Sequence, residues 1–186
     1  MVRDKFTFIQ KLRNKIKING SSNKIEINDN VKFVKNKVII KGDNNLLQIN
    51  KGVNIRGAFL QIVGNNCKLI ISENTIIGEN CYLSAKEENT TLLIGRDCML
   101  SRNAKIMTSD GHPIFDCNKS RINLARDIHI GSKVWIADSA TILKGVSVGN
   151  NCVIGINTVL TKSISDRCIA TGNPAKVVKE NITWKN

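Results

Sequence analysis

The chain has 186 residues, a length that suits one domain, and it carries a net charge of +13. Basic residues are spread along the whole chain and aromatic residues make up only 4% of it, so the composition does not predict a nucleic-acid-binding module. No apolar run is long enough to cross a membrane, and the first residues lack the apolar stretch of a signal peptide, so we expect a cytoplasmic protein.

Residues 1–22 are predicted to form a helical cap. Four apolar side chains stand close to helical spacing among basic residues, at Phe6, Ile9, Leu12 and Ile16. This pattern indicates a short amphipathic helix. Two roles are open for it, covering the open end of the domain that follows or contacting a membrane surface, and we favour the first.

Residues 23–170 carry an internal repeat. Short apolar segments recur at intervals of 22–23 residues, at Lys24–Ile27, Leu46–Ile49, Lys68–Ile71 and Leu92–Ile94. Each segment is expected to open one coil of a solenoid that begins near Ile25. Polar stretches at 41–45 and 86–90 supply the extra residues of these coils, and we expect them to protrude at corners.

From Ile128 to Leu160 the repeat shortens to six residues. Aliphatic side chains return at every sixth position, and a small residue or a valine follows four places later: Ile130, Ile136, Ile142, Val148, Ile154 and Leu160, with Val134, Ala140, Val146, Cys152 and Thr158. Neither a helix nor an ordinary strand has this period. Three hexads instead make one triangular coil, in which each aliphatic residue stacks on the one about 18 residues later and contributes ~1.5–3 kcal/mol by burial. The sequence therefore predicts an all-β fold, a parallel β-solenoid.

The hexads stop at residues 107–127, which form an extruded loop. A loop of this length in a regular scaffold indicates function, and its apolar residues indicate order. The loop holds His112, and an imidazole, which titrates near neutral pH, suits a general base that takes a proton from a hydroxyl group. Asp110 and Asp116 are both candidates to orient this ring.

The remaining histidine and the cysteines indicate no second catalytic site and no metal site. His129 alternates with two isoleucines on a short strand, which predicts a surface position. The six cysteines form no Cys-x-x-Cys pair, so we expect reduced structural thiols. A zinc enzyme on such a scaffold needs three histidine ligands and the chain has two histidines, so no metal is expected.

From Ile94 to Lys179 the chain resembles the hexapeptide-repeat acyltransferases. The hexads carry the resemblance, together with the segment Ser109–Asp116, which contains Gly-His-Pro as in galactoside and maltose acetyltransferases and is closer still to bacterial sialic-acid and capsular polysaccharide O-acetyltransferases. The tail Ala170–Lys179 is similar to the end of the acetyl-CoA-dependent branch. The resemblance implies a left-handed parallel β-helix, with a short C-terminal helix in residues 171–186.

The resemblance also implies a reaction. Acetyl-CoA would donate an acetyl group to a hydroxyl of a saccharide, either sialic acid or a capsular or other cell-surface polysaccharide. His112 would be the general base and Trp135 would line the donor site, with its indole N–H near the thioester sulfur. The family implies a homotrimer, and the basic surface would attract both coenzyme A and an anionic acceptor.

Matching the family residue by residue gives the donor-binding positions, which are Ala137, Asp138, Gly155, Ile156, Thr161, Lys162, Lys176 and Lys179. Asp138 and Ile156 replace the serine and alanine of the galactoside enzymes, so contacts through these two side chains stay open. Lysine replaces arginine at 176 and 179, which leaves a point charge without bidentate geometry.

Three questions stay open in the sequence. An N-acetyltransferase for nucleotide-linked amino sugars would use the same base, and a non-catalytic solenoid would serve as a binding scaffold. Trp135 suits packing between subunits as well as the donor site. The acceptor, and the chain that supplies each wall of a shared site, are not determined by the residues.

Overall fold

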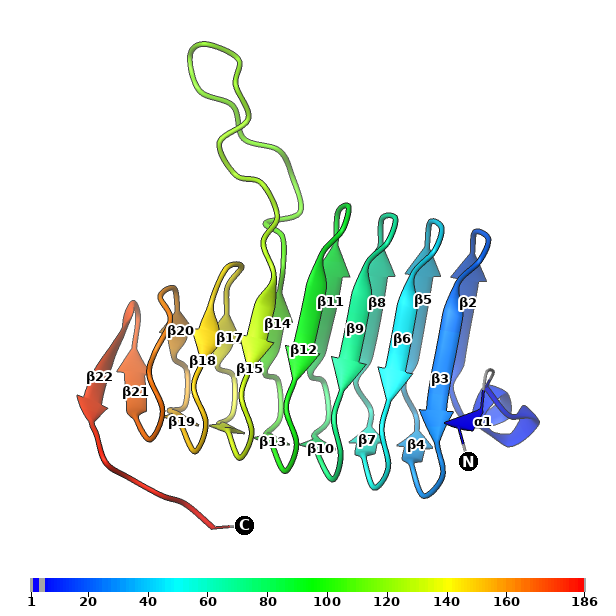
Figure 1. Ribbon diagram of the computed structural model, residues 1–186, viewed down its shortest axis with the longest axis horizontal. Helices are drawn as coiled ribbons and strands as arrows, with labels where there is room; N and C mark the ends of the chain where they lie inside the picture. Colours follow the sequence, from blue (N-terminus) through cyan, green and yellow to red (C-terminus); the bar gives the residue numbers. More distant parts are fainter. Residues whose placement is uncertain (1, 4–5, 186) are drawn as a thin grey trace.

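The computed structural model describes residues 2–3 and 6–185. The chain winds into a three-sided solenoid in which successive coils place their strands side by side, and one long loop leaves it (Figure 1). The expected left-handed parallel β-helix is confirmed.

Three sheets form the sides. Sheet A contains β1 (Val2–Arg3), β3 (Lys24–Asn28), β6 (Leu46–Ile49), β9 (Lys68–Ile71), β12 (Thr91–Ile94), β15 (Ile128–Ile130) and β18 (Ser147–Val148). Sheet B contains β2 (Lys15–Asn19), β5 (Lys37–Lys41), β8 (Phe59–Val63), β11 (Tyr82–Lys86), β14 (Lys105–Met107), β17 (Thr141–Ile142) and β20 (Val159–Leu160). Sheet C contains β4 (Lys32–Val34), β7 (Asn54–Arg56), β10 (Ile76–Ile77), β13 (Met99–Leu100), β16 (Trp135–Ile136), β19 (Val153–Ile154), β21 (Ile169–Gly172) and β22 (Ala175–Lys179).

The core is a stack of aliphatic side chains inside the three sheets. All six aliphatic residues of the hexads are buried, and so are the five residues that follow them at the small position. The register is the expected one, because Trp135 pairs with Val153 and Thr141 pairs with Val159, 18 residues later in each case. Earlier coils keep the longer period, with Lys24 opposite Leu46. The repeat read from the sequence is therefore confirmed in both of its lengths.

The prediction for the N-terminal segment is partly wrong. The helix α1 covers only Phe8–Arg13, and the first strand of the solenoid begins at Lys15 rather than near Ile25. Lysine and isoleucine alternate from Lys15 to Ile18, a strand period that lets β2 pair with β5. The side chain of Asn14 fixes the transition, because it donates to the carbonyl oxygen of Phe33 (3.0 Å).

The C-terminal prediction is also wrong, since residues 171–186 form no helix where they are described. Gly172 adopts a φ of 103°, which reverses the chain, and Ala175–Lys179 returns as β22 antiparallel to β21. The last parallel strand has an open edge, and the neighbouring Val177 and Val178 favour a strand that fills it. In the described residues α1 is the only helix, and none there is long and apolar enough to span a membrane.

The three edges of the prism differ in length. The edge where sheet C passes to sheet B, the C–B edge, comprises 35–36, 57–58, 78–81, 101–104, 137–140 and 155–158. The edge where sheet B passes to sheet A, the B–A edge, comprises 20–23, 42–45, 64–67, 87–90, 108–127, 143–146 and the residues that follow β20. The extruded loop is thus one segment of the B–A edge.

Candidate active site

The loop 108–127 leaves the solenoid through a narrow base. The backbone N–H of Arg126 donates to the carbonyl oxygen of Thr108 (3.0 Å), and the N–H of Thr91 donates to the carboxylate of Asp127 (2.8 Å). Further out, Phe115 and Arg121 form an antiparallel bridge, so the loop is a twisted hairpin that stands away from the coils (Figure 1). Its first residue is Thr108, because Met107 still belongs to β14.

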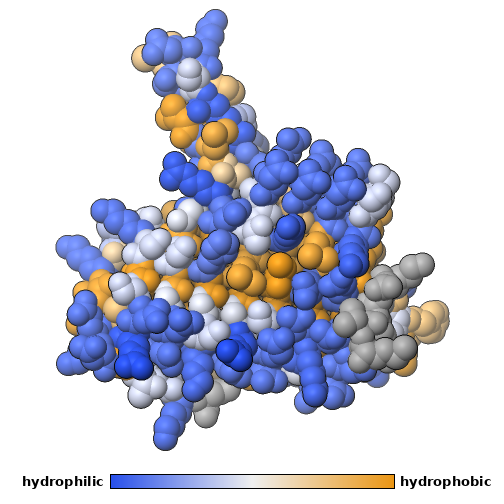
Figure 2. Space-filling view, viewed as in Figure 1, coloured by the Kyte–Doolittle hydropathy of each residue, from blue (hydrophilic) through white to orange (hydrophobic). Residues whose placement is uncertain are grey.

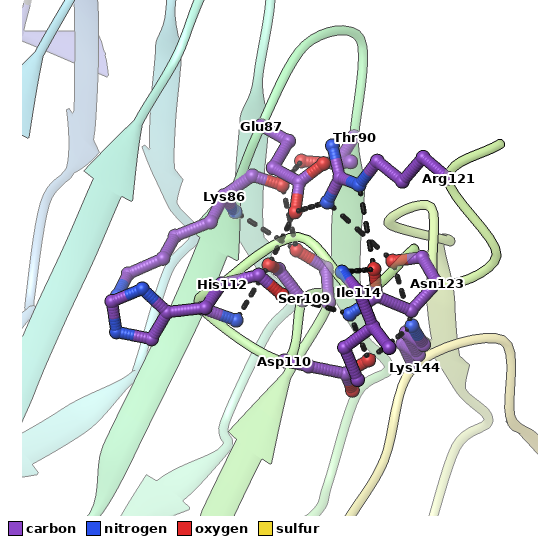
Figure 3. Close-up of polar contacts among 12 residues, drawn as sticks. Lys86, Glu87, Thr90, Ser109, Asp110, His112, Ile114, Arg121, Asn123 and Lys144 are labelled. Carbon is purple, nitrogen blue, oxygen red and sulfur yellow. Dashed lines mark hydrogen bonds and ion pairs between the residues drawn. The ribbon is translucent and has the colours of Figure 1, made fainter. Parts of the chain in front are cut away.

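Asn123 is the centre of the loop's polar contacts. It is buried, with 8% of its surface exposed, although it lies in a mostly exposed segment. Its amide nitrogen donates to the carboxylate of Asp110 (2.9 Å) and to the carbonyl oxygen of His112 (2.8 Å), and its amide oxygen accepts from the N–H of Ile114 (2.7 Å). One side chain therefore holds the backbone at His112 and Ile114 and also binds the Asp110 carboxylate (Figure 3).

Two ion pairs attach the loop to the coils on either side. Arg121 pairs with Glu87 of the preceding coil (2.7 Å), and Lys144 of the following coil pairs with Asp110 (2.5 Å). The hydrogen bond from Arg121 holds the pKa of Glu87 below its usual value. Burial raises the pKa of Asp110, but hydrogen bonds from Lys144 and Asn123 outweigh it and the net shift is downward. We call these five residues the loop clamp.

The His112 ring points away from the loop clamp (Figure 3). The residue is exposed, and among the described residues the ring has no hydrogen-bond partner while its backbone is held by Asn123. Neither candidate carboxylate orients the imidazole within the chain. Asp110 is engaged by Lys144 and Asn123, and Asp116 accepts the backbone N–H groups of Asn118 and Ser120.

The reason expected for the loop's order is wrong, although the loop is ordered. Its apolar side chains do not pack on the solenoid but remain 52–61% exposed: Ile114, Phe115, Ile122 and Leu124. Figure 2 shows apolar surface on the projecting loop. The loop clamp supplies the order, and the apolar side chains are left available to another surface.

Trp135 lies on β16 of sheet C, on a different side of the prism from the loop base. Its ring points outward as expected and packs against Trp184 of the returning tail, with ring centroids 6.1 Å apart. Its indole N–H donates to the hydroxyl of Ser101 (3.1 Å), and the indole N–H of Trp184 donates to the carbonyl oxygen of Lys133 (2.7 Å). Trp184 of the same chain therefore covers part of the outward-facing Trp135 ring.

The donor-binding positions fall into three groups. Ala137, Asp138, Gly155 and Ile156 stack on the C–B edge, where the N–H of Asn157 donates to the carbonyl oxygen of Asp138 (3.0 Å). The Asp138 carboxylate is held by Arg102 (2.9 Å), and Ile156 is 63% exposed. Thr161 and Lys162 are exposed beyond β20, on the loop's own edge. Lys176 and Lys179 lie on β22. The first two groups flank β17 and β20 of sheet B.

The buried thiols are unsuited to nucleophilic catalysis. Five of the six cysteines are buried and none forms a disulfide. Burial raises the pKa of Cys81 and of Cys98 to about 11, so both stay protonated at neutral pH. The other histidine, His129, is exposed on the outer face of β15, as expected. Among the described residues no group of three His, Cys, Asp or Glu side chains is placed to hold a metal ion.

Comparison with known proteins places this arrangement in a family. Residues 127–162 match the family model described as bacterial transferase hexapeptide (six repeats). The crystal structure of the polySia-specific acetyltransferase NeuO matches the fold with a TM-score of 0.72 at 34% sequence identity, covering 94% of this chain and 83% of that one. The chain belongs to the hexapeptide-repeat transferases.

Two curated relatives of this hexapeptide-repeat transferase carry the same name. The polysialic acid O-acetyltransferase of Escherichia coli O1:K1 / APEC is 43% identical over 131 residues, which are 70% of this chain and 41% of the relative. The polysialic acid O-acetyltransferase of Neisseria meningitidis is 38% identical over 122 residues, which are 64% of this chain and 56% of the relative. The chain thus spans about half the length of these curated relatives.

The loop clamp is the part of this transferase's site that sequence reasoning missed. One signal for it was present, because the 23-residue register between β11 and β14 places Glu87 near the start of the loop, where the Ser109 hydroxyl donates to the Glu87 carboxylate (2.6 Å). Asn123 and Lys144 gave no such signal. Their contacts depend on how the loop folds back, which no period specifies.

Proposed function

We propose that the protein is an acetyl-CoA-dependent O-acetyltransferase acting on a hydroxyl of a saccharide, with a sialic acid polymer as the favoured acceptor. The observation that carries the proposal is the exposed His112 ring on a backbone fixed by Asn123. A base held in place with a free ring can abstract a proton from a bulky acceptor. The names of both curated relatives support the reaction and the acceptor class.

In the proposed reaction, His112 takes the proton of the acceptor hydroxyl as that oxygen attacks the thioester carbon. A C–O bond forms and the C–S bond breaks, and the departing coenzyme A thiolate regains the proton from the imidazolium. Backbone N–H groups would stabilise the intermediate oxyanion. We assign Trp135 to lining the donor site with its ring, since its N–H already donates to Ser101.

We propose that coenzyme A lies along the outer face of β17 and β20. Small residues at the C–B edge, Ala137 and Gly155, would let the pantetheine arm approach the backbone. The exposed cations Lys162, Lys176 and Lys179 suit the anionic phosphates at the C-terminal end of the solenoid. Asp138 would act through its backbone, because its carboxylate is paired with Arg102.

We also propose that the protein works in the cytoplasm. Five buried free thiols suit a reducing compartment. Acetyl-CoA, the proposed donor, would have to be present in the same compartment.

The test is release of free coenzyme A from acetyl-CoA with a panel of acceptors. The panel contains polysialic acid, free sialic acid, an uncharged polysaccharide and a nucleotide-linked amino sugar, each with wild type and His112→Ala. We expect turnover with polysialic acid that the variant loses. Turnover only with the amino sugar would replace O-transfer by N-transfer, and no turnover with any acceptor would favour a non-catalytic scaffold.

We propose a homotrimer in which the loop meets a neighbouring chain. The apolar side chains of the loop are exposed and need a partner surface, and closed threefold symmetry supplies one with a heterologous contact. His112 would then face the Lys162 side of the neighbour. At a donor concentration well below the Michaelis constant, His112→Ala subunits lack turnover and Lys162→Ala subunits bind the donor weakly. Mixing the two after dissociation should give about a quarter of the sites both an intact loop and an intact donor groove, and so restore activity. A monomer in sedimentation would exclude the trimer, and no recovery would place both residues in one chain's site.

A further inference from the structure

The N-terminal end of the solenoid exposes an apolar surface that the proposed reaction does not use. Phe8, Ile9 and Leu12 of α1 are 81%, 59% and 77% exposed, and no residue of the helix is buried. Leu12 stands four residues after Phe8 and three after Ile9, the spacings at which helical side chains are neighbours, so the three side chains form one patch. We call it the α1 patch. In Figure 2 apolar surface projects at the end of the molecule where Figure 1 places α1.

The helix that carries the α1 patch is anchored at its start, although none of its own residues is buried. Thr7 and Gln10 form a capping box at the start of the helix. Phe6, just before it, is buried against Phe33, with ring centroids 5.6 Å apart. Phe6 therefore covers the core, as expected of a cap, and leaves the helix's own apolar face directed outward.

The segment that carries the α1 patch is rich in basic residues. Between Asp4 and Glu26 the sequence has no acidic residue, and it has six basic ones at Lys5, Lys11, Arg13, Lys15, Lys17 and Lys24. Four of them are exposed and have no carboxylate partner among the described residues: Lys11, Arg13, Lys15 and Lys17. An apolar patch in a cation-rich sequence is the composition of a segment that lies in the interface of an anionic membrane.

We infer that this end of the molecule binds an anionic lipid surface through the α1 patch. Phe8 and Leu12 enter the boundary between headgroups and acyl chains, while the cations contact lipid phosphates. A polyanionic saccharide would use the cations but leave the apolar side chains in water. A second copy docking through the same patch would bring a second set of the cations Lys11, Arg13 and Lys15 against this basic segment. An anionic lipid surface would contact both the apolar side chains and the basic ones.

Binding at this end leaves the loop accessible. Four strand steps of sheet B separate β2, beside α1, from β14, where the loop begins. At ~4.8 Å per step, the base of the loop stands about 19 Å further along the solenoid. The inference is independent of the proposed reaction, because it concerns the opposite end of the coil stack and is measured without turnover.

The experiment is flotation of the full chain with vesicles of phosphatidylcholine alone or mixed with phosphatidylglycerol. Wild type should float with the mixed vesicles and lose most binding in high salt. Phe8→Ser/Leu12→Ser should weaken binding roughly tenfold or more, and Lys11→Gln/Lys15→Gln roughly fivefold per charge. All four substituted residues are exposed, so the variants are expected to fold. A thermal melt of each variant checks this.

Matched controls carry the same changes elsewhere. Val178→Ser removes an apolar side chain that is 58% exposed at the other end, and Lys51→Gln/Lys68→Gln removes two exposed charges from the flank. Both should bind like wild type. Failure of wild type to float with anionic vesicles would overturn the inference, as would equal flotation of Phe8→Ser/Leu12→Ser. Self-association lost in that variant, without lipid binding, would assign the patch to a second copy.

Discussion

The three edges of the prism differ in how much their length varies from coil to coil. Six residues separate Ile27 from Phe33 on the way from sheet A to sheet C, and six separate the equivalent Ile130 and Ile136. From sheet C to sheet B the separation is five or six in every coil. From sheet B to sheet A it is 11 from Val38 to Ile49, 24 from Ile106 to Ile130 and 6 from Ile142 to Val148.

This difference shows where the molecule can carry a specialised segment. The edge from sheet A to sheet C keeps one length in every coil, and the C–B edge varies by at most one residue, because the aliphatic side chains of the flanking strands must stay in the core. The B–A edge varies in length without moving any buried residue. The loop that holds His112 occupies this edge, so an exposed histidine is added to a rigid scaffold with no loss of packing.

The sharpest test of the comparison uses the two histidines, one on the loop and one on a strand. His112→Ala should lower turnover by roughly 10²–10⁴-fold, the usual contribution of acid–base catalysis, with the affinity for coenzyme A nearly unchanged. His129→Ala, on the outer face of β15, is the control and should keep wild-type kinetics. Steady-state rates with saturating acceptor decide, and near-normal turnover of His112→Ala would remove it as the base.

Insertions test whether the edge between sheets A and C is less tolerant of added residues than the B–A edge. A single Gly inserted after Ser132, between sheets A and C, should destabilise the fold by about 3 kcal/mol or more, because Val134 and Ile136 leave register. The same insertion after Asn118, at the exposed tip of the loop, should change the free energy of unfolding by less than ~1 kcal/mol. Thermal unfolding measures both, and equal losses would mean that the B–A edge is not free.

Asn123→Ala tests whether the loop clamp positions the base. The backbone of His112 would lose its anchor, and a misplaced base lowers the rate, so we expect turnover to fall roughly 10–100-fold. The acetyl-CoA Michaelis constant and the melting temperature should stay close to wild type. Asn118→Ala, at the loop tip, is the matched control. A melting temperature that falls in parallel with activity would indicate a structural role instead.

The smallest effects concern the donor. Lys162→Ala and Lys176→Ala should each raise the acetyl-CoA Michaelis constant by roughly fivefold with turnover unchanged, because a phosphate contact forms equally in ground and transition states. Lys68→Ala, an exposed lysine on sheet A, should have no effect. Dephospho-coenzyme A should separate the contacts. If its relative loss is the same in wild type and variants, these lysines do not meet the phosphates.

The solenoid could be predicted because its signal repeats. Ile130, Ile136 and Ile142 each restate the same requirement, so an error at one position does not change the fold. The ends have no such redundancy. Ile16 fits a helical spacing from Leu12 as well as a strand alternation with Ile18, and only pairing with β5 decides between them. At the other end the open edge of β21 makes a strand of Ala175–Lys179.

The sequence could name candidate site residues but not their arrangement. His112 could be found because a rare residue interrupts a regular pattern. The sequence could not show that its ring lacks a partner within the chain, or that Asp110 is already engaged by Lys144. These facts depend on ion pairs and hydrogen bonds between residues far apart in the sequence, and the hexad repeat does not specify such contacts.

Both ends of the coil stack finish with a reversed strand. β1 runs antiparallel to β3 at the first coil, and β22 runs antiparallel to β21 at the last. A parallel solenoid with bare ends presents the same hydrogen-bonding edge that its own coils use, and identical molecules could stack end to end into a fibre. The reversed strands, with Phe6 and α1 at the first coil, occupy part of those edges. They act as stops that keep a self-propagating architecture at a finite length.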